Sequence, residues 1–262
     1  MSNQDRSHPA HPECPYSQER PREMARWYEV EAAKLAKSNE ELRQFAYAAS
    51  HDLREPLGKI KAFGKRLEER SGPALDDKGR DYLGIMLSAA DRMSNLIDDL
   101  LEYSMVEKNG VPDTPVDLSA VLAEVFSLFS EKLVGAEIHC DTLPVVRGDE
   151  TQIYTLFQNL IGNAIKFRKP DGPVRIWVTG DESPKESVVT VRDEGIGFEQ
   201  EHAEKIFRVF ERLHTRFNYP GTGIGLALCK RIVERHEGSI SAVGTPGVGA
   251  EFRIVFPKRG EA

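Results

Sequence analysis

The chain has 262 residues, of which 40% are hydrophobic and 29% charged, a composition typical of one or two soluble globular domains. Its net charge of −7 argues against nonspecific nucleic-acid binding, which needs a clustered basic surface. No apolar run approaches the roughly 20 residues that span a bilayer, and the amino terminus lacks the apolar core of a signal peptide. We therefore expect a cytoplasmic protein without membrane insertion. Three cysteines without a CxxC pair favour neither a disulfide framework nor a four-ligand zinc site.

The amino-terminal region changes character near residue 22. Residues 1–22 are rich in proline and polar residues, which predicts a flexible tail. Beyond them, apolar residues recur at alternating steps of four and three from Tyr28 to Ile60. This period is typical of a coiled coil, which we expect over residues 23–45 in a parallel homodimer. An amphipathic helix packed within one chain is the alternative.

Residues 46–108 predict a helical hairpin, broken at residues 71–74 by Ser-Gly-Pro-Ala. Its first helix carries His51 beside Asp52 in an alanine-rich stretch. A neutral imidazole nitrogen is a nucleophile near pH 7, and an adjacent carboxylate can orient the ring and take up its proton. Alone this motif is weak, because a single helical histidine is more often an ordinary surface or core residue. One hairpin has too little core to be stable, so we expect two hairpins to form a dimeric four-helix bundle.

Residues 109–116 form a turn-rich linker, and a second domain is expected over residues 117–258. Helical periodicity covers about 117–134, 149–168 and 223–237, and alternating β-branched and aromatic residues predict strands at about 173–180, 187–193, 239–244 and 250–256. This order predicts an α+β sandwich, with helices on one face of a mixed sheet.

Three polar residues of the second domain share one helix face. Asn159, Asn163 and Lys166 follow at spacings of four and three. Carboxamide oxygens can ligate a hard cation such as Mg²⁺, and an ammonium group can meet phosphate oxygens. On an exposed helix the same residues would often only be solvated.

Two glycine-rich segments accompany this helix. Asp193 ends an apolar strand and is followed by Gly195 and Gly197, where a carboxylate can accept a hydrogen bond from the exocyclic amine of adenine. The second segment, residues 221–226, precedes a helix whose first amides would face phosphate oxygens. No apolar strand immediately precedes it, which excludes a Rossmann fingerprint. Residues 207–220 predict a mobile lid instead.

Together these motifs, over about residues 42–257, resemble the transmitter core of a bacterial sensor histidine kinase of the two-component family. The motifs that carry the resemblance are the box around His51, the asparagine box at 159–166, DxGxG at 193–197, the paired phenylalanines Phe207 and Phe210, and GTGIGL at 221–226. The lid and last helix are most similar to the bacteriophytochrome-like subgroup.

The resemblance implies a homodimeric kinase with a GHKL-type ATP-binding domain that phosphorylates His51 from ATP, with Asp52 as orienting acid and general base. The phosphoryl group would then pass to an aspartate in the receiver domain of a response regulator. The implied nucleotide-site roles are Mg²⁺ ligation by Asn159 and Asn163, phosphate contact by Lys166, adenine recognition by Asp193, and close backbone approach to ATP at Gly195, Gly197, Gly221, Gly223 and Gly225. Arg212, Arg216 and Tyr219 are weaker lid candidates.

Two departures from the family pattern stand out. Many relatives carry Thr or Asn four residues after the phosphoacceptor, whereas this chain has Glu55, which puts phosphatase activity in doubt. No sensory domain precedes residue 22, so we expect a sensory partner protein to act through residues 23–45, unless the chain is a fragment. Two alternatives are a catalytically silent adaptor and a gyrase- or chaperone-like ATPase. The intact asparagine, aspartate and glycine motifs argue against the adaptor, and the His51 hairpin argues against the ATPase.

Overall fold

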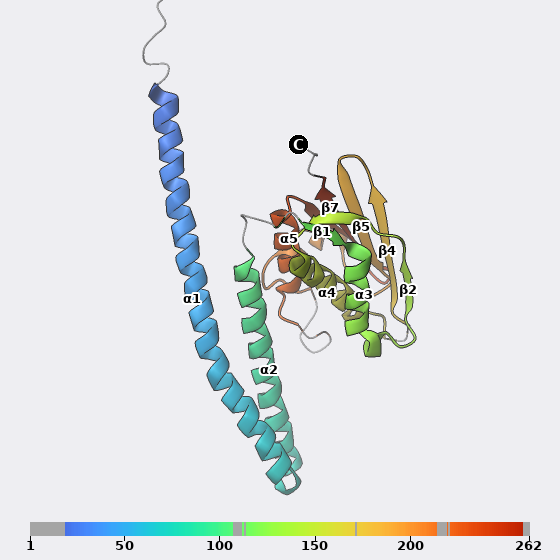
Figure 1. The fold of residues 1–262 in the computed structure, drawn as a ribbon. Helices are drawn as coiled ribbons and strands as arrows, with labels where there is room; N and C mark the ends of the chain where they lie inside the picture. The colour runs from blue at the N-terminus through green and yellow to red at the C-terminus, as the bar shows by residue number, and fades with distance from the viewer. Residues whose placement is uncertain are drawn as a thin grey trace, which may run out of the picture. The chain divides into compact units, whose positions relative to one another are not determined.

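The computed structural model describes residues 19–106, 112, 114–170, 172–213, 219 and 221–258 (Figure 1). The chain divides into two units, one up to Ala48 and one from Ala49 onward, and the second contains the helical hairpin and the α+β domain. Within the described ranges, the helices are too polar or too short to cross a bilayer. The cytoplasmic location expected from the sequence stays a prediction.

The first helix, α1 (Glu19–Ser71), begins earlier than the sequence predicted. The sequence places residues 19–22 in the flexible tail, but they are helical. Pro21 is compatible with the first turn, because the first N–H groups of a helix have no partner within it. Pro56 also lies inside α1 and does not end it. Residues 1–18 lie outside the described part of the chain, so the tail expected there stays a prediction.

The turn of the hairpin forms where the sequence predicts a break. A short 3₁₀-helix, η2 (Gly72–Ala74), leads to the second long helix, α2 (Asp77–Met105). The Asp76 carboxylate accepts a hydrogen bond of 2.8 Å from the Gly79 N–H and so caps the start of α2. The predicted helical hairpin is confirmed.

The second domain is built on a five-stranded mixed sheet. In spatial order its strands are β2 (Glu137–Cys140), β4 (Arg175–Glu182), β5 (Glu186–Asp193), β7 (Gly249–Pro257) and β6 (Ser239–Thr245). β2 pairs with β4 in parallel, and every other pair in this sheet is antiparallel. A separate pair, β1 (Thr114–Asp117) and β3 (Val145–Gly148), is antiparallel.

Three helices cover one face of this sheet (Figure 1). They are α3 (Leu118–Leu128), α4 (Glu150–Lys166) and α5 (Gly225–Arg235), with short 3₁₀-helices η3 (Ser130–Leu133), η4 (Gln200–His202) and η5 (Lys205–Phe207) in the connections. Asp117 and Asp149 cap α3 and α4 by accepting hydrogen bonds from N–H groups of the first turn. The predicted α+β layer, with helices on one face of a mixed sheet, is confirmed.

The core of this domain lies between the sheet and the helices. Alternate residues of β5, such as Val189 and Val191, are buried, whereas the next residue, Arg192, is exposed. The buried face of α4 is formed by Ile153, Leu156, Phe157, Leu160 and Ile161. This packing fixes the directions of the polar residues on the same helix, which line the site described below.

The sequence pattern did not predict three of the short strands, β1, β2 and β3. β1, β2 and β3 have four residues each, too few for an alternating pattern to stand out. β1 occupies residues 114–117, so the last part of the predicted linker is a strand, and the strand is recognisable only through its pairing with β3.

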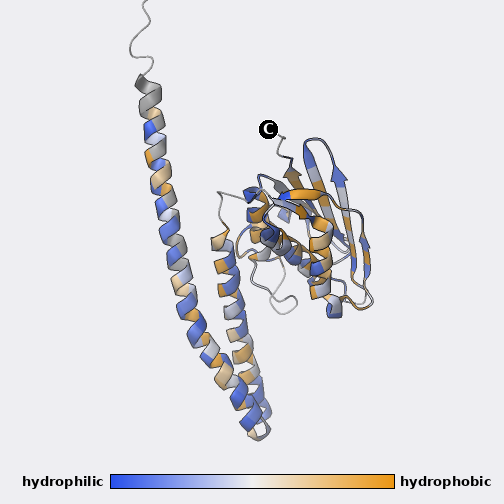
Figure 2. Cartoon of the chain, in the orientation of Figure 1, coloured by the Kyte–Doolittle hydropathy of each residue, from blue (hydrophilic) through white to orange (hydrophobic). Residues whose placement is uncertain are grey.

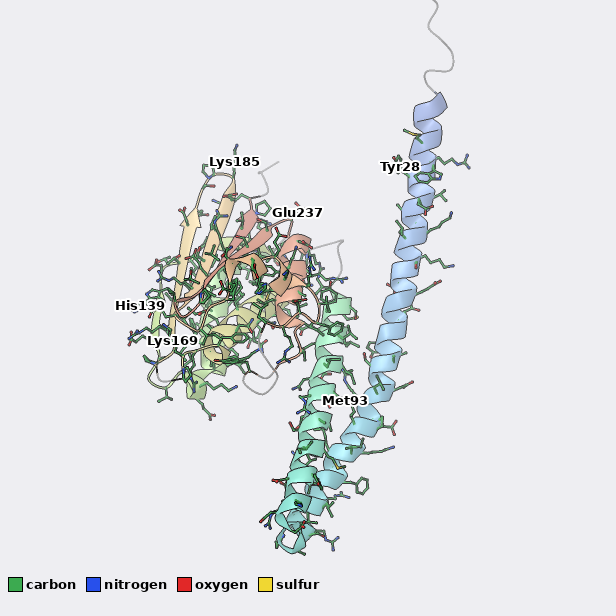
Figure 3. All side chains as sticks on the ribbon, turned by 180° about the vertical axis from the view of Figure 1, so that it is seen from behind. Tyr28, Met93, His139, Lys169, Lys185 and Glu237 are labelled. Atoms are coloured by element: carbon green, nitrogen blue, oxygen red, sulfur yellow. The ribbon has the colours of Figure 1, made fainter. Side chains whose placement is uncertain are left out.

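The hairpin by itself has a small core. Leu57, Ala90 and Ile97 form its buried cluster, while α1 and α2 carry many further apolar residues interspersed with hydrophilic ones (Figure 2). One of them, Met93 of α2, is 51% exposed (Figure 3). The hairpin therefore presents apolar side chains that its own two helices do not bury.

Candidate functional site

A cavity of about 440 Å³ opens where α4, the end of β5 and the start of α5 meet. Its size lies within the usual range for ligand pockets, roughly 300–1,000 Å³. The sequence-predicted residues on its wall are Asn159, Asn163, Lys166, Asp193, Gly197, Gly221, Gly223 and Gly225. Gly195 is not on the wall. The structure thus brings together residues that are far apart in the sequence and were grouped by motif alone.

Asp193 stands at the end of β5 and is 8% exposed. Its Oδ1 accepts hydrogen bonds from the N–H groups of Gly195, at 2.8 Å, and Ala250, at 3.3 Å. Burial raises the pKa of this carboxyl to about 6, and the two backbone hydrogen bonds oppose that rise. At neutral pH the group is mainly ionised. It can therefore accept a further hydrogen bond from a ligand in the cavity.

Lys166, the last residue of α4, lines the cavity together with a second cation, Arg212. Its Nζ lies 4.3 Å from the centroid of the Phe167 ring. Burial, and secondly the charge of Arg212, lower the pKa of Lys166 to about 8. Two cations that disfavour each other in a partly desolvated site are stabilised by an anion between them, so this end of the cavity suits phosphate oxygens.

Arg212 also organises the segment that the sequence predicts as a lid. Its guanidinium donates hydrogen bonds to the carbonyl oxygens of Tyr219, at 2.7 Å, and of Gly221. The Tyr219 ring packs against Phe167, with centroids 5.2 Å apart. Of the weaker candidates, Arg212 and Tyr219 therefore lie at the cavity, and Arg216 is outside the described residues.

The two asparagines present their side chains differently. The amide nitrogen of Asn159 donates to the carbonyl oxygen of Thr155 at 2.9 Å, which orients Oδ1 toward Gly225. A Cβ at Gly225 would clash with that oxygen. Asn163 also lines the cavity, and its side chain forms no hydrogen bond within the described part of the chain. Amide oxygens in this setting fit a hard cation such as Mg²⁺.

The glycines owe their presence mainly to contacts between protein segments. Gly197 and Gly223 have positive φ angles of 63° and 82°, which favour glycine. A Cβ at Gly197 would clash with the Thr245 carbonyl oxygen, and one at Gly195 would clash with that of Phe167. The sequence analysis attributes these glycines to close approach of the backbone to a ligand. The structure shows that they also allow neighbouring backbone segments of the cavity wall to pack closely against each other.

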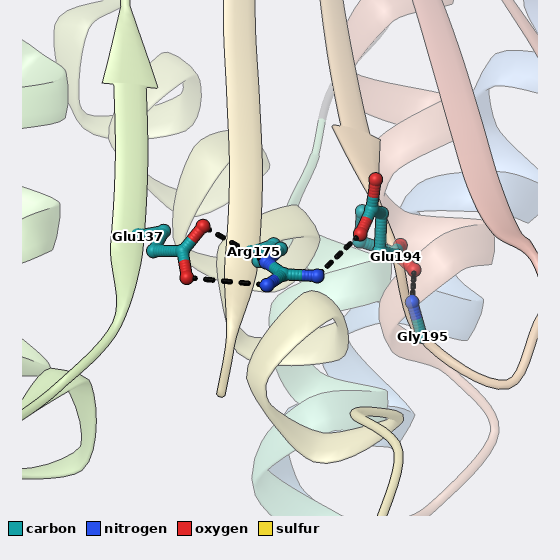
Figure 4. A network of polar contacts seen from close by, with 5 residues as sticks. Glu137, Arg175, Glu194 and Gly195 are labelled. Carbon is teal, nitrogen blue, oxygen red and sulfur yellow. Dashed lines mark hydrogen bonds and ion pairs between the residues drawn. The ribbon is translucent and has the colours of Figure 1, made fainter. Parts of the chain in front are cut away.

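An ion-pair network connects the start of β4 to the residue that follows β5, next to Gly195 (Figure 4). Arg175 on β4 binds the Glu137 carboxylate of β2 at 2.8 and 3.3 Å and the Glu194 carboxylate at 3.1 Å. Glu194 lies between Asp193 and Gly195. This network connects the edge strand to the loop that carries the buried aspartate.

His51 lies on α1 and is not among the residues that line the cavity. Its imidazole is 71% exposed, and Nδ1 lies 3.2 Å from the Asp52 carboxylate. The other ring nitrogen, Nε2, is therefore the one open to an incoming electrophile. Four residues further on, Glu55 forms an ion pair of 2.5 Å with Lys59.

The predicted site residues do not include two acidic residues of α2 that line the cavity. Asp99 and Glu102, one turn apart on α2, line the cavity together with the second domain. Thr222 donates a hydrogen bond to Asp99, and the Thr155 hydroxyl donates one to Glu102 at 3.1 Å. Acidic residues are common on exposed helix faces, so nothing in the sequence marked this pair.

Comparisons with known proteins agree with this arrangement. Residues 41–109 match the His Kinase A (phospho-acceptor) domain, and residues 148–260 match the histidine kinase-, DNA gyrase B- and HSP90-like ATPase family. The phytochrome-like protein Cph1 of Synechocystis sp. is 39% identical over 229 residues, which cover 86% of this chain and 30% of that protein. The chain thus spans less than a third of this relative's length.

Two solved structures share the fold. ShkA in complex with AMPPNP has a TM-score of 0.63 and 25% identity, over 84% of this chain and 47% of that one. ThkA in complex with the response regulator protein TrrA has a TM-score of 0.55 and 26% identity, over 82% of this chain and 61% of that one.

The fold and the site define a two-part protein of the histidine kinase class, in which a helical hairpin with an exposed histidine precedes an ATPase-type domain with a polar cavity. The chain belongs to the sensor histidine kinases and carries their transmitter core.

Proposed function

We propose that this chain is an ATP-dependent protein-histidine kinase that phosphorylates its own His51 and passes the phosphoryl group to an aspartate of a response regulator. The observation that carries the proposal is the cavity that combines the buried Asp193 carboxylate, two cations and two asparagine side chains, in a chain that also exposes a carboxylate-oriented imidazole. AMPPNP in ShkA and TrrA on ThkA are ligands of related structures, and they support ATP and a receiver domain here.

The chemistry assigned to His51 follows from its ring contacts. The Nε2 lone pair attacks the γ-phosphorus, an N–P bond forms, and the bond from phosphorus to the leaving ADP oxygen breaks. Asp52, at Nδ1, stabilises the charge on the ring and takes up its proton. Because His51 does not line the cavity, the nucleotide domain and the histidine must approach each other before this step.

Each cavity residue then receives one task. Asp193 accepts a hydrogen bond from the adenine amine, and Lys166 contacts phosphate oxygens. Asn159 and Asn163 would hold Mg²⁺, which neutralises phosphate charge during transfer. Gly195, Gly197, Gly221, Gly223 and Gly225 allow the surrounding backbone to take the required shape.

We further propose that the hairpins of two chains pair as a four-helix bundle. The hairpin buries only a small cluster, yet Phe63, Tyr82, Ile85 and Met86 are each more than half exposed. A second hairpin would remove these side chains from water. The proposed organisation is a tail before residue 19, a helical segment over 19–45 that forms the signalling coiled coil, a dimerisation and phosphotransfer domain over 46–108, a linker over 109–113 and the ATP-binding domain over 114–258.

A sensory partner acting through the coiled coil and a cytoplasmic location belong to the same proposal. No phosphatase activity is included, because Glu55 is ion-paired to Lys59 and offers neither a hydroxyl nor a carboxamide to orient water.

The direct test compares ATP labelled in the γ-phosphate with ATP labelled in the α-phosphate. The proposal predicts that only the γ-label becomes covalently bound to the protein, and that Asn163→Ala abolishes this labelling while the protein stays folded. Equal incorporation of both labels would indicate nucleotide attachment rather than phosphoryl transfer. Absence of γ-label in protein that binds ATP and Mg²⁺ would favour the silent adaptor.

A further inference from the structure

The last turns of α2 form one wall of the nucleotide cavity, and this wall is acidic. Asp99 and Glu102 both line the cavity. Asp99 accepts a hydrogen bond from Thr222, which stands between two glycines of the segment after the lid, and Glu102 accepts one from Thr155 of α4. Both hydrogen-bond donors belong to the nucleotide domain, so the two carboxylates hold α2 against it.

A third contact fixes the same helix from outside the cavity. Arg231 of α5 lies 4.6 Å above the Tyr103 ring and donates a hydrogen bond of 3.0 Å to the Val106 carbonyl oxygen. Val106 is 5% exposed and belongs to the core cluster of the nucleotide domain. The end of α2 is therefore docked through a cation–π contact, hydrogen bonds and apolar burial.

The charge of this wall is not compensated. No ion pair joins Asp99 or Glu102 to a cation in the described ranges. Burial raises the pKa of both carboxyls, and their hydrogen bonds to neutral hydroxyls offset that rise in part. Two carboxylates in a partly desolvated wall repel a polyanion placed in the same cavity.

We propose that docking of the acidic end of α2 and binding of ATP are mutually antagonistic, so that docked α2 is a resting state which bound nucleotide disfavours. The inference rests on the proposed ATP site. In the docked state Asp99 accepts a hydrogen bond from Thr222, which belongs to the glycine segment assigned to the ATP phosphates. The negative charge of Asp99 repels these phosphates. By thermodynamic reciprocity, bound ATP weakens the docking of α2 by the same factor by which docking weakens the binding of ATP. Release of α2 frees the nucleotide domain to approach His51.

The test is a calorimetric titration of the whole chain with AMPPNP and Mg²⁺. The variant Asp99→Asn/Glu102→Gln keeps the side-chain shapes and removes both charges. We expect its Kd to fall roughly three- to tenfold below that of the wild type. Arg231→Ala loosens docking without touching the cavity wall and should also tighten binding, although it removes a positive charge.

Asp98→Asn is the matched control. Asp98 is one residue from Asp99 but pairs with Arg54 at 2.7 Å and does not line the cavity, so its removal should leave the Kd unchanged. Equal tightening in this control, or unchanged or weaker binding in the double variant, would overturn the inference. A wild type that binds no nucleotide would instead overturn the proposed ATP site.

Hydrogen exchange of the wild type supplies a readout that needs no variant. Saturating AMPPNP should increase amide exchange in the docked end of α2, residues 99–106, while it protects the cavity residues of α4. Protection of both segments together would show that nucleotide and docking cooperate, and would contradict the antagonism.

Discussion

At the residue scale, Asp193 combines a cost in stability with the proposed role in adenine recognition. Its pKa is raised from 3.8 to about 6, so its ionised form is disfavoured by folding. A group with a raised pKa contributes stability that is present at low pH and is lost as the pH rises through the folded-state pKa. Asp193 therefore weakens the folded state at neutral pH, and we attribute its presence to the ligand.

The Asp193→Asn variant should separate these effects. At pH 7.5 we expect its free energy of unfolding to exceed the wild-type value by about 1–3 kcal/mol, because the amide oxygen can still accept while no charge is buried. The difference should vanish toward pH 4. Affinity for ATP should fall at least about tenfold, since an amide donor would face the adenine amine. Denaturant unfolding and nucleotide titration measure both, with the exposed Asp181→Asn as control.

Lys166, whose pKa is shifted in the opposite direction to that of Asp193, predicts a pH dependence of nucleotide binding. Its pKa is lowered to about 8, and bound phosphate would raise it, so ATP binding takes up a proton above that pH. The affinity should be constant below pH 7 and fall by up to about tenfold per pH unit above pH 8. Lys166→Gln should bind weakly, with an affinity that no longer changes between pH 7 and 9. A wild type whose affinity is flat across this range would contradict the assigned phosphate contact.

At the scale of elements, the junction between α4 and α5 couples packing to the site. Gly225 begins α5 and does not have a left-handed backbone, so alanine there would suit the helix. Its Cβ would nevertheless clash with Asn159 Oδ1. We expect Gly225→Ala to change stability by less than about 1 kcal/mol while ATP affinity falls severalfold.

The matched control for this substitution is Gly84→Ala on α2. A Cβ at Gly84 meets no atom within 4 Å, so the change should stabilise its helix slightly and leave nucleotide binding as it was. If Gly225→Ala retains wild-type affinity, the orientation of Asn159 is not needed for binding.

The elements that could be predicted from the sequence are those long enough to show several repeats of the helical or strand pattern of apolar residues. The long helices and the strands of seven to nine residues were recognised from apolar periodicity. The four-residue strands were not, because they exist through pairing with distant partners. Motif residues such as Asp193 were found for their chemistry, but Asp99 and Glu102 reach the cavity only through docking of α2, which no local pattern encodes.

At the scale of the whole molecule, the proposed dimer depends on apolar side chains that one hairpin leaves exposed. Replacing two of them, as in Phe63→Asp/Ile85→Asp, would place charges in the proposed interface. We expect sedimentation to show a dimer for the wild type and a monomer for this variant, whose helices would be less stable. Lys59→Asp/Arg80→Asp changes two exposed charged residues of the same hairpin and should stay dimeric. A monomeric wild type at micromolar concentration would contradict the four-helix bundle.

The account as a whole depends on His51 as the phosphoryl acceptor. The most direct measurement incubates the wild type and His51→Gln with γ-labelled ATP and Mg²⁺, and then tests the stability of the label in acid and in base. We predict a label on the wild type that is lost in acid and stable in base, as expected for a phosphorus–nitrogen bond, and none on His51→Gln. Label that survives acid, or that persists in His51→Gln, would show that another residue accepts the phosphoryl group.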